Sequence, residues 1–261
     1  MNLNNQSINV KLQGNPKNPP IILGHALGMN LNAWDYVSGI LSNNYYVLMW
    51  DLPGHGKSAP LSKDKSQLGE LEIVGELLKI CDELKIDKFH YVGTSIGGVI
   101  GQQLSIFYPE RLLSLSLTNT GAKIGTPEAW MERKKNVEVS SLKTMNVDIV
   151  SRWFSKKSLS DHPYLLETWN DTLAKTDDHS YALLCEWLSE HDLRGKLKPL
   201  NIPAIFIAGS EDIATPPQVV LDLAKYMEIN DICCFENVGH IPSVEIPDIF
   251  TNTLVTFLIN S

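Results

Sequence analysis

Long apolar runs are missing from this chain, and their absence argues against a membrane-spanning segment. No stretch of the 261 residues approaches the roughly 20 apolar residues that a transmembrane helix needs. Residues 1–6 carry neither the positive charge nor the apolar core of a secretory signal peptide. We therefore expect a cytoplasmic protein with no membrane contact.

Cysteine is scarce, and its spacing fits neither a disulfide framework nor a metal site. The four cysteines are Cys81, Cys185, Cys233 and Cys234, and they form no C-x-x-C pair. The seven histidines show no H-E-x-x-H pattern or other metal-binding cluster. A chain of this length buries enough surface to fold without such staples. We expect reduced thiols, no metal and no cofactor.

Positive charge is also in short supply. The chain has 22 lysines and arginines against 30 aspartates and glutamates, which gives a net charge of −8. This balance disfavours nucleic acid and anionic membrane surfaces as partners. A small neutral or weakly anionic molecule fits it better. The sequence gives no signal for the oligomeric state.

What the chain does contain is a regular alternation of strand-like and helix-like segments. Helical periodicity is clear at 71–84, 218–227 and 248–259, and briefer at 34–41. Between these segments lie apolar, β-branched runs at 8–12, 21–23, 45–50, 89–92, 113–117, 204–208 and 232–235. The pattern predicts an α/β fold with a mostly parallel sheet of about eight strands and helices on both faces.

Residues 122–199 interrupt the alternation. They lack strand-like runs, and Thr126-Pro127-Glu128 has the features of a helix start. We expect a helical cap, or lid, inserted into a core domain formed by residues 1–121 and 200–261. The charged run Arg133-Lys134-Lys135 is interpreted as a solvated helix face.

Aromatic side chains are concentrated in this expected cap. Four of the six tryptophans fall there, and rings of this kind often line the apolar wall of a ligand site. The alternative is that they pack the small core of the cap itself. The candidate substrate contacts are Trp130, Arg152, Trp153, Phe154 and Trp187.

The most informative motif is Gly93-Thr94-Ser95-Ile96-Gly97, which joins a strand-like run to a helix-like run. A G-x-S-x-G sequence in this context is typical of a nucleophile elbow, a strained turn that exposes its serine. Ser95 is therefore the candidate nucleophile. The alternative is a glycine-rich turn without chemistry.

A serine hydroxyl needs a base to remove its proton and a carboxylate to orient that base. Asp212 follows the predicted strand at 204–208, at the sheet edge where open α/β folds place their sites. His240 follows the predicted strand at 232–235. The alternatives are a helix-capping aspartate and a surface histidine. The order Ser95, Asp212, His240 along the chain is the one described for the α/β-hydrolase fold.

A tetrahedral intermediate also needs backbone N–H groups that stabilise its oxyanion. One is expected from Ile96, directly after the candidate nucleophile. The second is expected from Leu27, in the loop after the strand at 21–23, with Ala26 as the alternative. His25 in the same loop, and His55 in a glycine-rich turn, are interpreted as structural.

With these motifs the chain resembles the α/β-hydrolase superfamily, and within it the 3-oxoadipate enol-lactonases. The resemblance includes L-G-x-x-L-x-x-W at 27–34, I-G-T-x-E-x-W at 124–130, A-G-x-x-D-x-x-T-P-P at 208–217 and H-I-P-S-V-E at 240–245. It implies Ser95 as nucleophile, His240 as base and Asp212 as the acid that orients the base. It further implies substrate contacts from Arg152 and Trp153.

The expected activity is that of a cofactor-free serine hydrolase acting on a lactone or small carboxylic ester through an acyl-enzyme. A carboxylate-bearing enol-lactone would depend on a cation such as Arg152. The main alternative substrate, an N-acyl homoserine lactone whose hydrolysis quenches quorum sensing, would depend on Trp153, Phe154 and Trp187. A C–C bond hydrolase, a perhydrolase and a non-catalytic ligand receptor are further alternatives.

Overall fold

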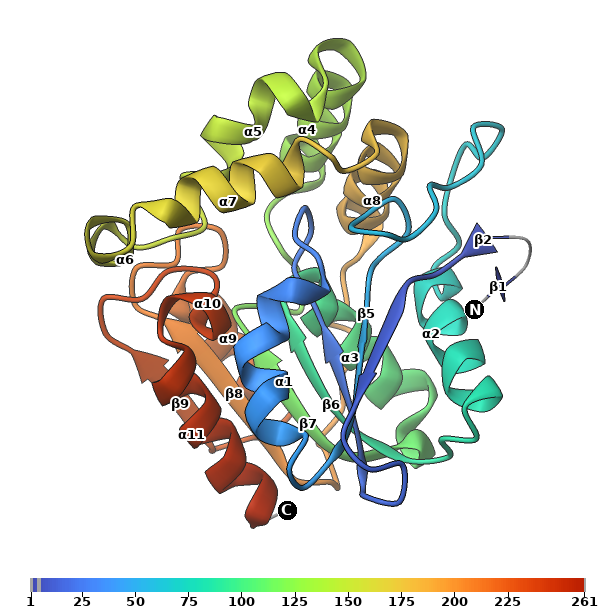
Figure 1. Cartoon of the computed structure of the whole chain (residues 1–261), viewed down its shortest axis with the longest axis vertical. Coiled ribbons are helices and arrows are strands. Elements are labelled where there is room, and N and C mark those ends of the chain that lie inside the picture. Colours follow the sequence, from blue (N-terminus) through green and yellow to red (C-terminus); the bar gives the residue numbers. More distant parts are fainter. Residues whose placement is uncertain (1, 4–5, 261) are drawn as a thin grey trace.

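The centre of the molecule is a sheet of seven strands (Figure 1). The computed structural model describes residues 2–3 and 6–260. The sheet has the order β3-β5-β4-β6-β7-β8-β9, and every pairing is parallel except that of β3 with β5. Its strands are β3 (Val10–Gln13), β4 (Pro20–Gly24), β5 (Tyr46–Trp50), β6 (Phe89–Thr94), β7 (Leu112–Thr118), β8 (Ala204–Gly209) and β9 (Ile232–Phe235).

The prediction of a mostly parallel α/β sheet is confirmed, with seven strands in place of about eight. Each of the seven strand-like runs of the sequence forms a strand. The short strands β1 (Asn2–Leu3) and β2 (Gln6–Ser7) pair only with each other.

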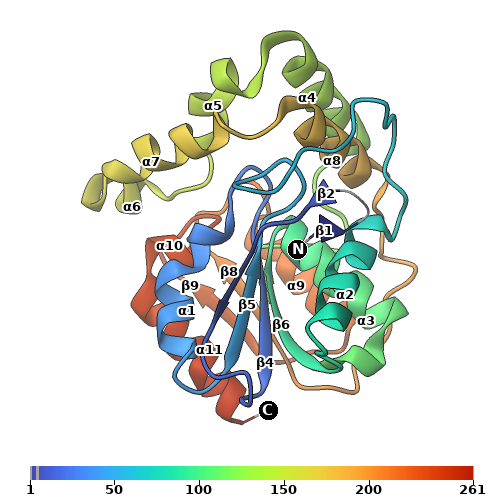
Figure 2. The same cartoon turned by 45° about the vertical axis from the view of Figure 1, so that its right-hand side comes forward.

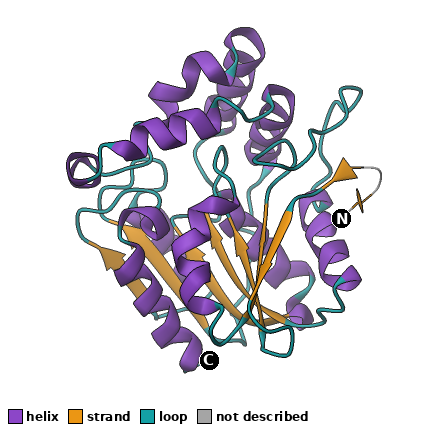
Figure 3. Cartoon of the chain, in the orientation of Figure 1, coloured by secondary structure: helices purple, strands orange, loops and turns teal. Residues whose placement is uncertain are grey.

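Helices cover both faces of the sheet (Figure 3). One face packs against α1 (Asp35–Leu41) and α11 (Pro247–Ile259), through a buried cluster that includes Trp34 and Phe250. The other face packs against α2 (Glu72–Glu83), α3 (Ile96–Phe107) and α9 (Pro217–Tyr226). In α2 the buried side chains recur at the helical period, as the sequence predicts.

Five helices lie between β7 and β8 along the chain and stand over the carboxyl ends of the parallel strands (Figure 2). We call this layer the cap. It consists of α4 (Pro127–Ser140), α5 (Leu142–Val150), α6 (Lys156–Asp161), α7 (Tyr164–Leu173) and α8 (Asp178–Glu190). The α4 helix starts where the sequence indicates, because the Thr126 hydroxyl accepts a hydrogen bond from the Ala129 amide at 3.2 Å. The domain boundaries at 122 and 199 stay a prediction.

Parallel register brings several strand ends together beneath the cap. Gly24 pairs with Gly93 and Thr94 pairs with Thr118, so β4, β6 and β7 end at one level. The loops that follow these strands, and the loop after β8, therefore share one sheet edge. In the described residues, no helix is both long enough and apolar enough to cross a membrane.

Candidate active site

Ser95 occupies a sharp turn between β6 and α3. Its φ of 58° and ψ of −118° are strained for a residue with a side chain. The turn also requires glycine on both sides. A Cβ on Gly93 would lie 2.3 Å from the Gly97 carbonyl oxygen, and a Cβ on Gly97 would lie 2.3 Å from that of Gly24. The local geometry is that of the predicted elbow.

Asp212 and His240 meet beside this turn. The Nδ1 atom of His240 lies 2.7 Å from Oδ2 of Asp212, with both side chains at most 5% exposed. Oδ1 of Asp212 accepts hydrogen bonds from the amides of Ala214 at 2.8 Å and Thr215 at 3.0 Å. Burial alone would raise the pKa of Asp212, but the charge of His240 and hydrogen bonds to the carboxylate lower it. The carboxylate is thus held in its ionised form against the imidazole.

Asn119 supports this pair and is absent from the sequence-based candidates. It follows β7 with a φ of 47°, a conformation that asparagine tolerates. Its Nδ2 donates to Asp212 Oδ2 at 2.7 Å and to the Gly239 carbonyl oxygen at 3.1 Å. The available signal was its place at the carboxyl end of the strand next to β6.

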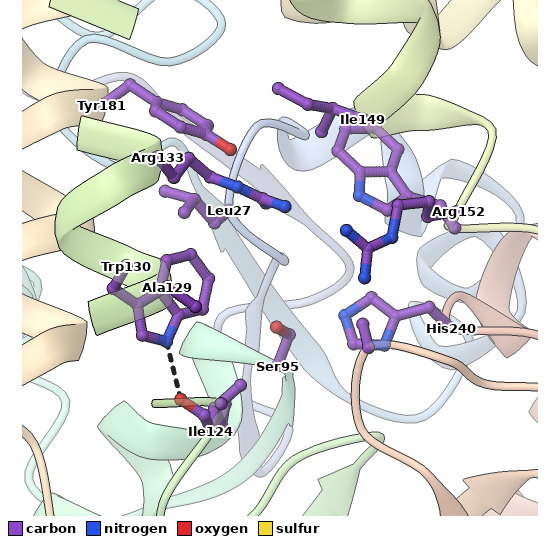
Figure 4. A pocket seen from close by; sticks show the side chains of 13 residues that line it. Leu27, Ser95, Ile124, Ala129, Trp130, Arg133, Ile149, Arg152, Tyr181 and His240 are labelled. Carbon is purple, nitrogen blue, oxygen red and sulfur yellow. Dashed lines mark hydrogen bonds between the residues drawn. The ribbon is translucent and has the colours of Figure 1, made fainter. Parts of the chain in front are cut away.

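A cavity of about 160 Å³ lies between the sheet edge and the cap. The side chains of Ser95 and His240 both reach it and lie beside each other (Figure 4). The remaining lining residues are Leu27, Ile124, Gly125, Ala129, Trp130, Arg133, Ile149, Arg152, Trp153, Tyr181 and Ala214. Within residues 2–3 and 6–260, no group of three or more His, Cys, Asp or Glu side chains could hold a metal ion.

The cavity contains three of the five predicted substrate contacts, namely Trp130, Arg152 and Trp153. Phe154 lies outside it, because its ring packs edge-on against Trp153 within the buried core. Trp187 also lies outside. Its Nε1 donates to the carbonyl oxygens of residues 69 and 70 at 3.2 Å, which fastens α8 to the loop before α2. The cavity therefore gives no support to the predictions for Phe154 and Trp187.

Arg133 lines the cavity, although the sequence was interpreted as placing it on a solvated helix face. Its guanidinium carbon lies 5.3 Å from the ring centre of Trp130, and the group points into the cavity toward Arg152 (Figure 4). Consecutive residues of a helix point about 100° apart, so one charged run can place one side chain in the cavity and the next outside it. Lys134, next in sequence, instead pairs with Glu186 at 2.7 Å. Neither cavity arginine forms an ion pair with any carboxylate in the part of the chain that the structure describes.

Of the two predicted oxyanion donors, Ile96 follows Ser95 directly, and Leu27 lies in the loop after β4. Ile96 is the first residue of α3, and the N–H groups of a first helical turn have no acceptor within the helix. Leu27 reaches the cavity from a turn closed by a 3.1 Å hydrogen bond from the Met29 amide to the Ala26 carbonyl. Gly28, with a φ of 82°, gives this turn its type II shape.

Two buried histidines brace that turn. Nε2 of His55 accepts from the Gly28 amide at 3.0 Å, and Nε2 of His25 accepts from the Leu52 amide at 3.0 Å. Their Nδ1 atoms lie 2.9 Å and 2.8 Å from carbonyl oxygens, so each ring donates there and stays neutral. Burial lowers both pKa values, and that of His55 falls to about 3. These contacts agree with a structural role for both residues.

This neutrality predicts a loss of stability in acid. Because the folded pKa of His55 is below the value of about 6.5 in an unfolded chain, its stabilising contribution is complete above pH 6.5 and declines toward pH 3. We expect the free energy of unfolding to fall by about 2 kcal/mol between pH 7.5 and pH 5 through His55 alone. The free energy of unfolding, measured in urea, should depend less steeply on pH in His55→Gln than in the parent. In the exposed His162→Gln it should have the same pH dependence as in the parent. Identical slopes for His55→Gln and the parent would contradict the assignment.

Comparisons with known proteins agree with this fold. The profile of the alpha/beta hydrolase fold matches residues 19–245. The 3-oxoadipate enol-lactonase 2 of Acinetobacter baylyi is 31% identical over 95% of this chain and 91% of its own length. The crystal structure of the enol-lactonase from Burkholderia xenovorans LB400 is 30% identical, covers 99% of both chains and has a TM-score of 0.92. A structure described as an N-acyl homoserine lactone degrading enzyme, 20% identical over 98% of both chains, shares the fold with a TM-score of 0.83.

Proposed function

Because the chain belongs to the family of proteins with the alpha/beta hydrolase fold, we propose that it is a serine hydrolase that opens a lactone or cleaves a small carboxylic ester. One observation carries the proposal. The elbow serine and a histidine paired with a buried carboxylate reach the same cavity, Ser95 from β6 and His240 from the loop after β9. Nucleophilic catalysis by serine needs a nucleophile and an oriented base at one site.

In the proposed reaction His240 Nε2 takes the proton of Ser95 as Oγ attacks the carbonyl carbon. The amides of Ile96 and Leu27 stabilise the resulting oxyanion. Collapse breaks the bond to the leaving oxygen, which receives the proton from His240 and, in a lactone, stays attached to the acyl group. Water then attacks the acyl-enzyme with His240 as base, which releases the carboxylic acid and restores Ser95.

The charge of the cavity indicates the substrate class. Arg133 and Arg152 both line the cavity, Arg133 partly buried and Arg152 exposed, and neither has a carboxylate counter-charge among the described residues. A carboxylate on the substrate would supply that counter-charge through charge-assisted hydrogen bonds. Together with the enol-lactonase relatives, this favours a carboxylate-bearing lactone such as 3-oxoadipate enol-lactone.

A neutral N-acyl homoserine lactone is the second candidate. The rings of Trp130 and Trp153 in the cavity wall offer apolar surface to an acyl chain. Phe154 and Trp187, the other two rings that this interpretation used, lie elsewhere. The aromatic support for this substrate is therefore weaker than the sequence suggested.

Removing either cavity cation should separate the two candidates. In Arg133→Met and Arg152→Met we expect kcat/KM for 3-oxoadipate enol-lactone to fall about 10- to 100-fold, the usual worth of a hydrogen bond to a charged group. Turnover of p-nitrophenyl acetate, which carries no carboxylate, should change less than about threefold. Lys134→Met is the matched control, because this neighbour pairs with Glu186 outside the cavity.

The opposite result would support the neutral substrate. Arginine variants that leave every anionic lactone unaffected would contradict the carboxylate proposal. If Trp153→Leu then reduced turnover of a hexanoyl homoserine lactone while the arginine variants did not, the acyl homoserine lactone would take its place. Steady-state kinetics on the three substrates side by side gives both answers.

A further inference from the structure

Glu245 is a buried carboxylate that the proposed reaction does not use. It ends α10 (Pro242–Glu245) and is 4% exposed. Its Oε2 accepts hydrogen bonds from the amides of Gly239 and Ser155, both at 2.9 Å, and its Oε1 accepts from the amide of Ile241 at 3.1 Å. No lysine, arginine or histidine in the described part of the chain pairs with it. Three backbone N–H groups therefore stabilise its charge.

These three amides belong to two segments that are far apart in sequence. Gly239 and Ile241 flank His240 in what we call the base loop, residues 237–241. Ser155 belongs to the cap strap, residues 152–155, which leads from α5 to α6 and carries the cavity residues Arg152 and Trp153. One carboxylate thus joins the loop of the candidate base to the segment that carries two candidate substrate contacts.

The base loop and the cap strap also touch directly. The amide of His240 donates to the Trp153 carbonyl oxygen at 2.7 Å. A Cβ on Gly239 would lie 2.7 Å from the Ser155 nitrogen and 2.8 Å from the Trp153 oxygen, closer than real Cβ atoms approach. The two backbones are therefore packed against each other with no room for a side chain between them.

Both backbone polar groups of Gly239 are bonded in this arrangement. Its N–H donates to Glu245, and its carbonyl oxygen accepts from Asn119, which also binds Asp212. The imidazole of His240 is held from the ring side by Asp212. Glu245 holds the backbone on both sides of His240, through the amides of Gly239 and Ile241, and also binds the cap strap.

We propose that Glu245 is a positioning residue that fastens the base loop to the cap strap, so that His240 keeps one placement relative to Arg152 and Trp153. The role of His240 as base depends on the proposed function. The contacts that place His240 relative to the cap strap do not depend on it. Glutamine cannot replace this side chain, because its NH₂ group would face an amide N–H in place of an acceptor oxygen.

The test compares Glu245→Gln with Glu211→Gln. Glu211 is exposed, and its carboxylate accepts from the Lys156 amide at 3.2 Å, just beyond the cap strap. Glu211 meets the base loop only through its backbone amide, which donates to the Val238 carbonyl oxygen and is unchanged in Glu211→Gln. The first readout is the low-field proton resonance of His240 Nδ1–H, which the hydrogen bond to Asp212 produces. We expect Glu245→Gln to shift or abolish this resonance and Glu211→Gln to retain it.

The second readout is kinetic. A displaced base should lower kcat about 10- to 100-fold on both p-nitrophenyl acetate and 3-oxoadipate enol-lactone in Glu245→Gln, which is part of the roughly 10²- to 10⁴-fold that general base catalysis contributes. Glu245→Asp, which retains the charge, should recover part of the loss. If Glu245→Gln does not fold, Gly239→Ala tests the same contact by pushing the cap strap away, and the same two changes are expected.

Two results would overturn the proposal. One is an unchanged resonance with unchanged kcat in folded Glu245→Gln, or in Gly239→Ala if that variant is used. The other is a higher KM for the carboxylate substrate alone, which would mean that Glu245 serves only the cap. A failure of the proposed function gives a different result. In that case Ser95→Ala would still hydrolyse the ester, while Glu245→Gln would still shift the His240 resonance.

Discussion

Ser95→Ala is expected to lower kcat for p-nitrophenyl acetate by on the order of 10⁶-fold, the loss seen when the nucleophile of a cooperating triad is removed. Without Oγ there is no acyl-enzyme, and His240 has no proton to accept. The cavity arginines and the oxyanion amides remain, so substrate should still bind. Pre-steady-state kinetics with excess substrate should show no burst of p-nitrophenol. A fluorophosphonate probe should no longer label the protein.

Ser95→Gly is the matched control, because it also removes Oγ but relieves the backbone. A residue with a side chain at φ 58° and ψ −118° stores about 1–3 kcal/mol of strain, against about 1 kcal/mol of added chain entropy for glycine. We expect Ser95→Gly to be equally inactive and up to about 2 kcal/mol more stable, with Ser95→Ala close to the parent. Ester hydrolysis that persists in both variants would contradict the assignment of the nucleophile.

The sheet could be predicted closely because its signal is local. A parallel strand covered on both faces is a short apolar run, and each of the seven runs became a strand. The helix α2 likewise shows its buried face in the spacing of its apolar residues. The main sheet has seven strands where about eight were expected.

The candidate triad could also be predicted, since each member follows a strand and the order of the three is diagnostic. The cavity wall could not. Arg133 and Lys135 stand in one charged run, and only the packing of α4 decides that Arg133 faces the cavity while Lys135 faces solvent. Counting tryptophans had the same weakness, because Trp130 reaches the cavity and Trp187 anchors α8.

Asn119 and Glu245 show a second limit. Each acts through contacts with residues about 90 or more positions away, Asn119 with Asp212 and Glu245 with Ser155. A single asparagine after a strand reads as a turn residue, and a glutamate near a helix reads as surface charge. Their roles depend on which loops the fold brings to one sheet edge, and that information is not local in the sequence.

Asp212→Asn is expected to lower kcat by about 10⁴-fold, an effect that follows from the tautomer of the base. In the native site Asp212 Oδ2 accepts from His240 Nδ1 at 2.7 Å, from the Thr215 hydroxyl at 2.6 Å and from Asn119 at 2.7 Å, while Oδ1 accepts from two amides. Asparagine offers one oxygen and one NH₂. With its oxygen kept by the two amides, the NH₂ faces Nδ1, and the proton of the imidazole moves to Nε2.

An imidazole protonated at Nε2 cannot accept the proton of Ser95, so acylation should slow even though the nucleophile is intact. Slow labelling of Asp212→Asn by a fluorophosphonate, with complete labelling at long times, would distinguish it from Ser95→Ala. Glu211→Gln, which changes the exposed neighbour, should stay within about threefold of the parent. If instead Asp212→Asn kept kcat within tenfold and Glu211→Gln did not, Glu211 would be the orienting acid. The five donors around Asp212, and the exposure of Glu211, argue for the first outcome.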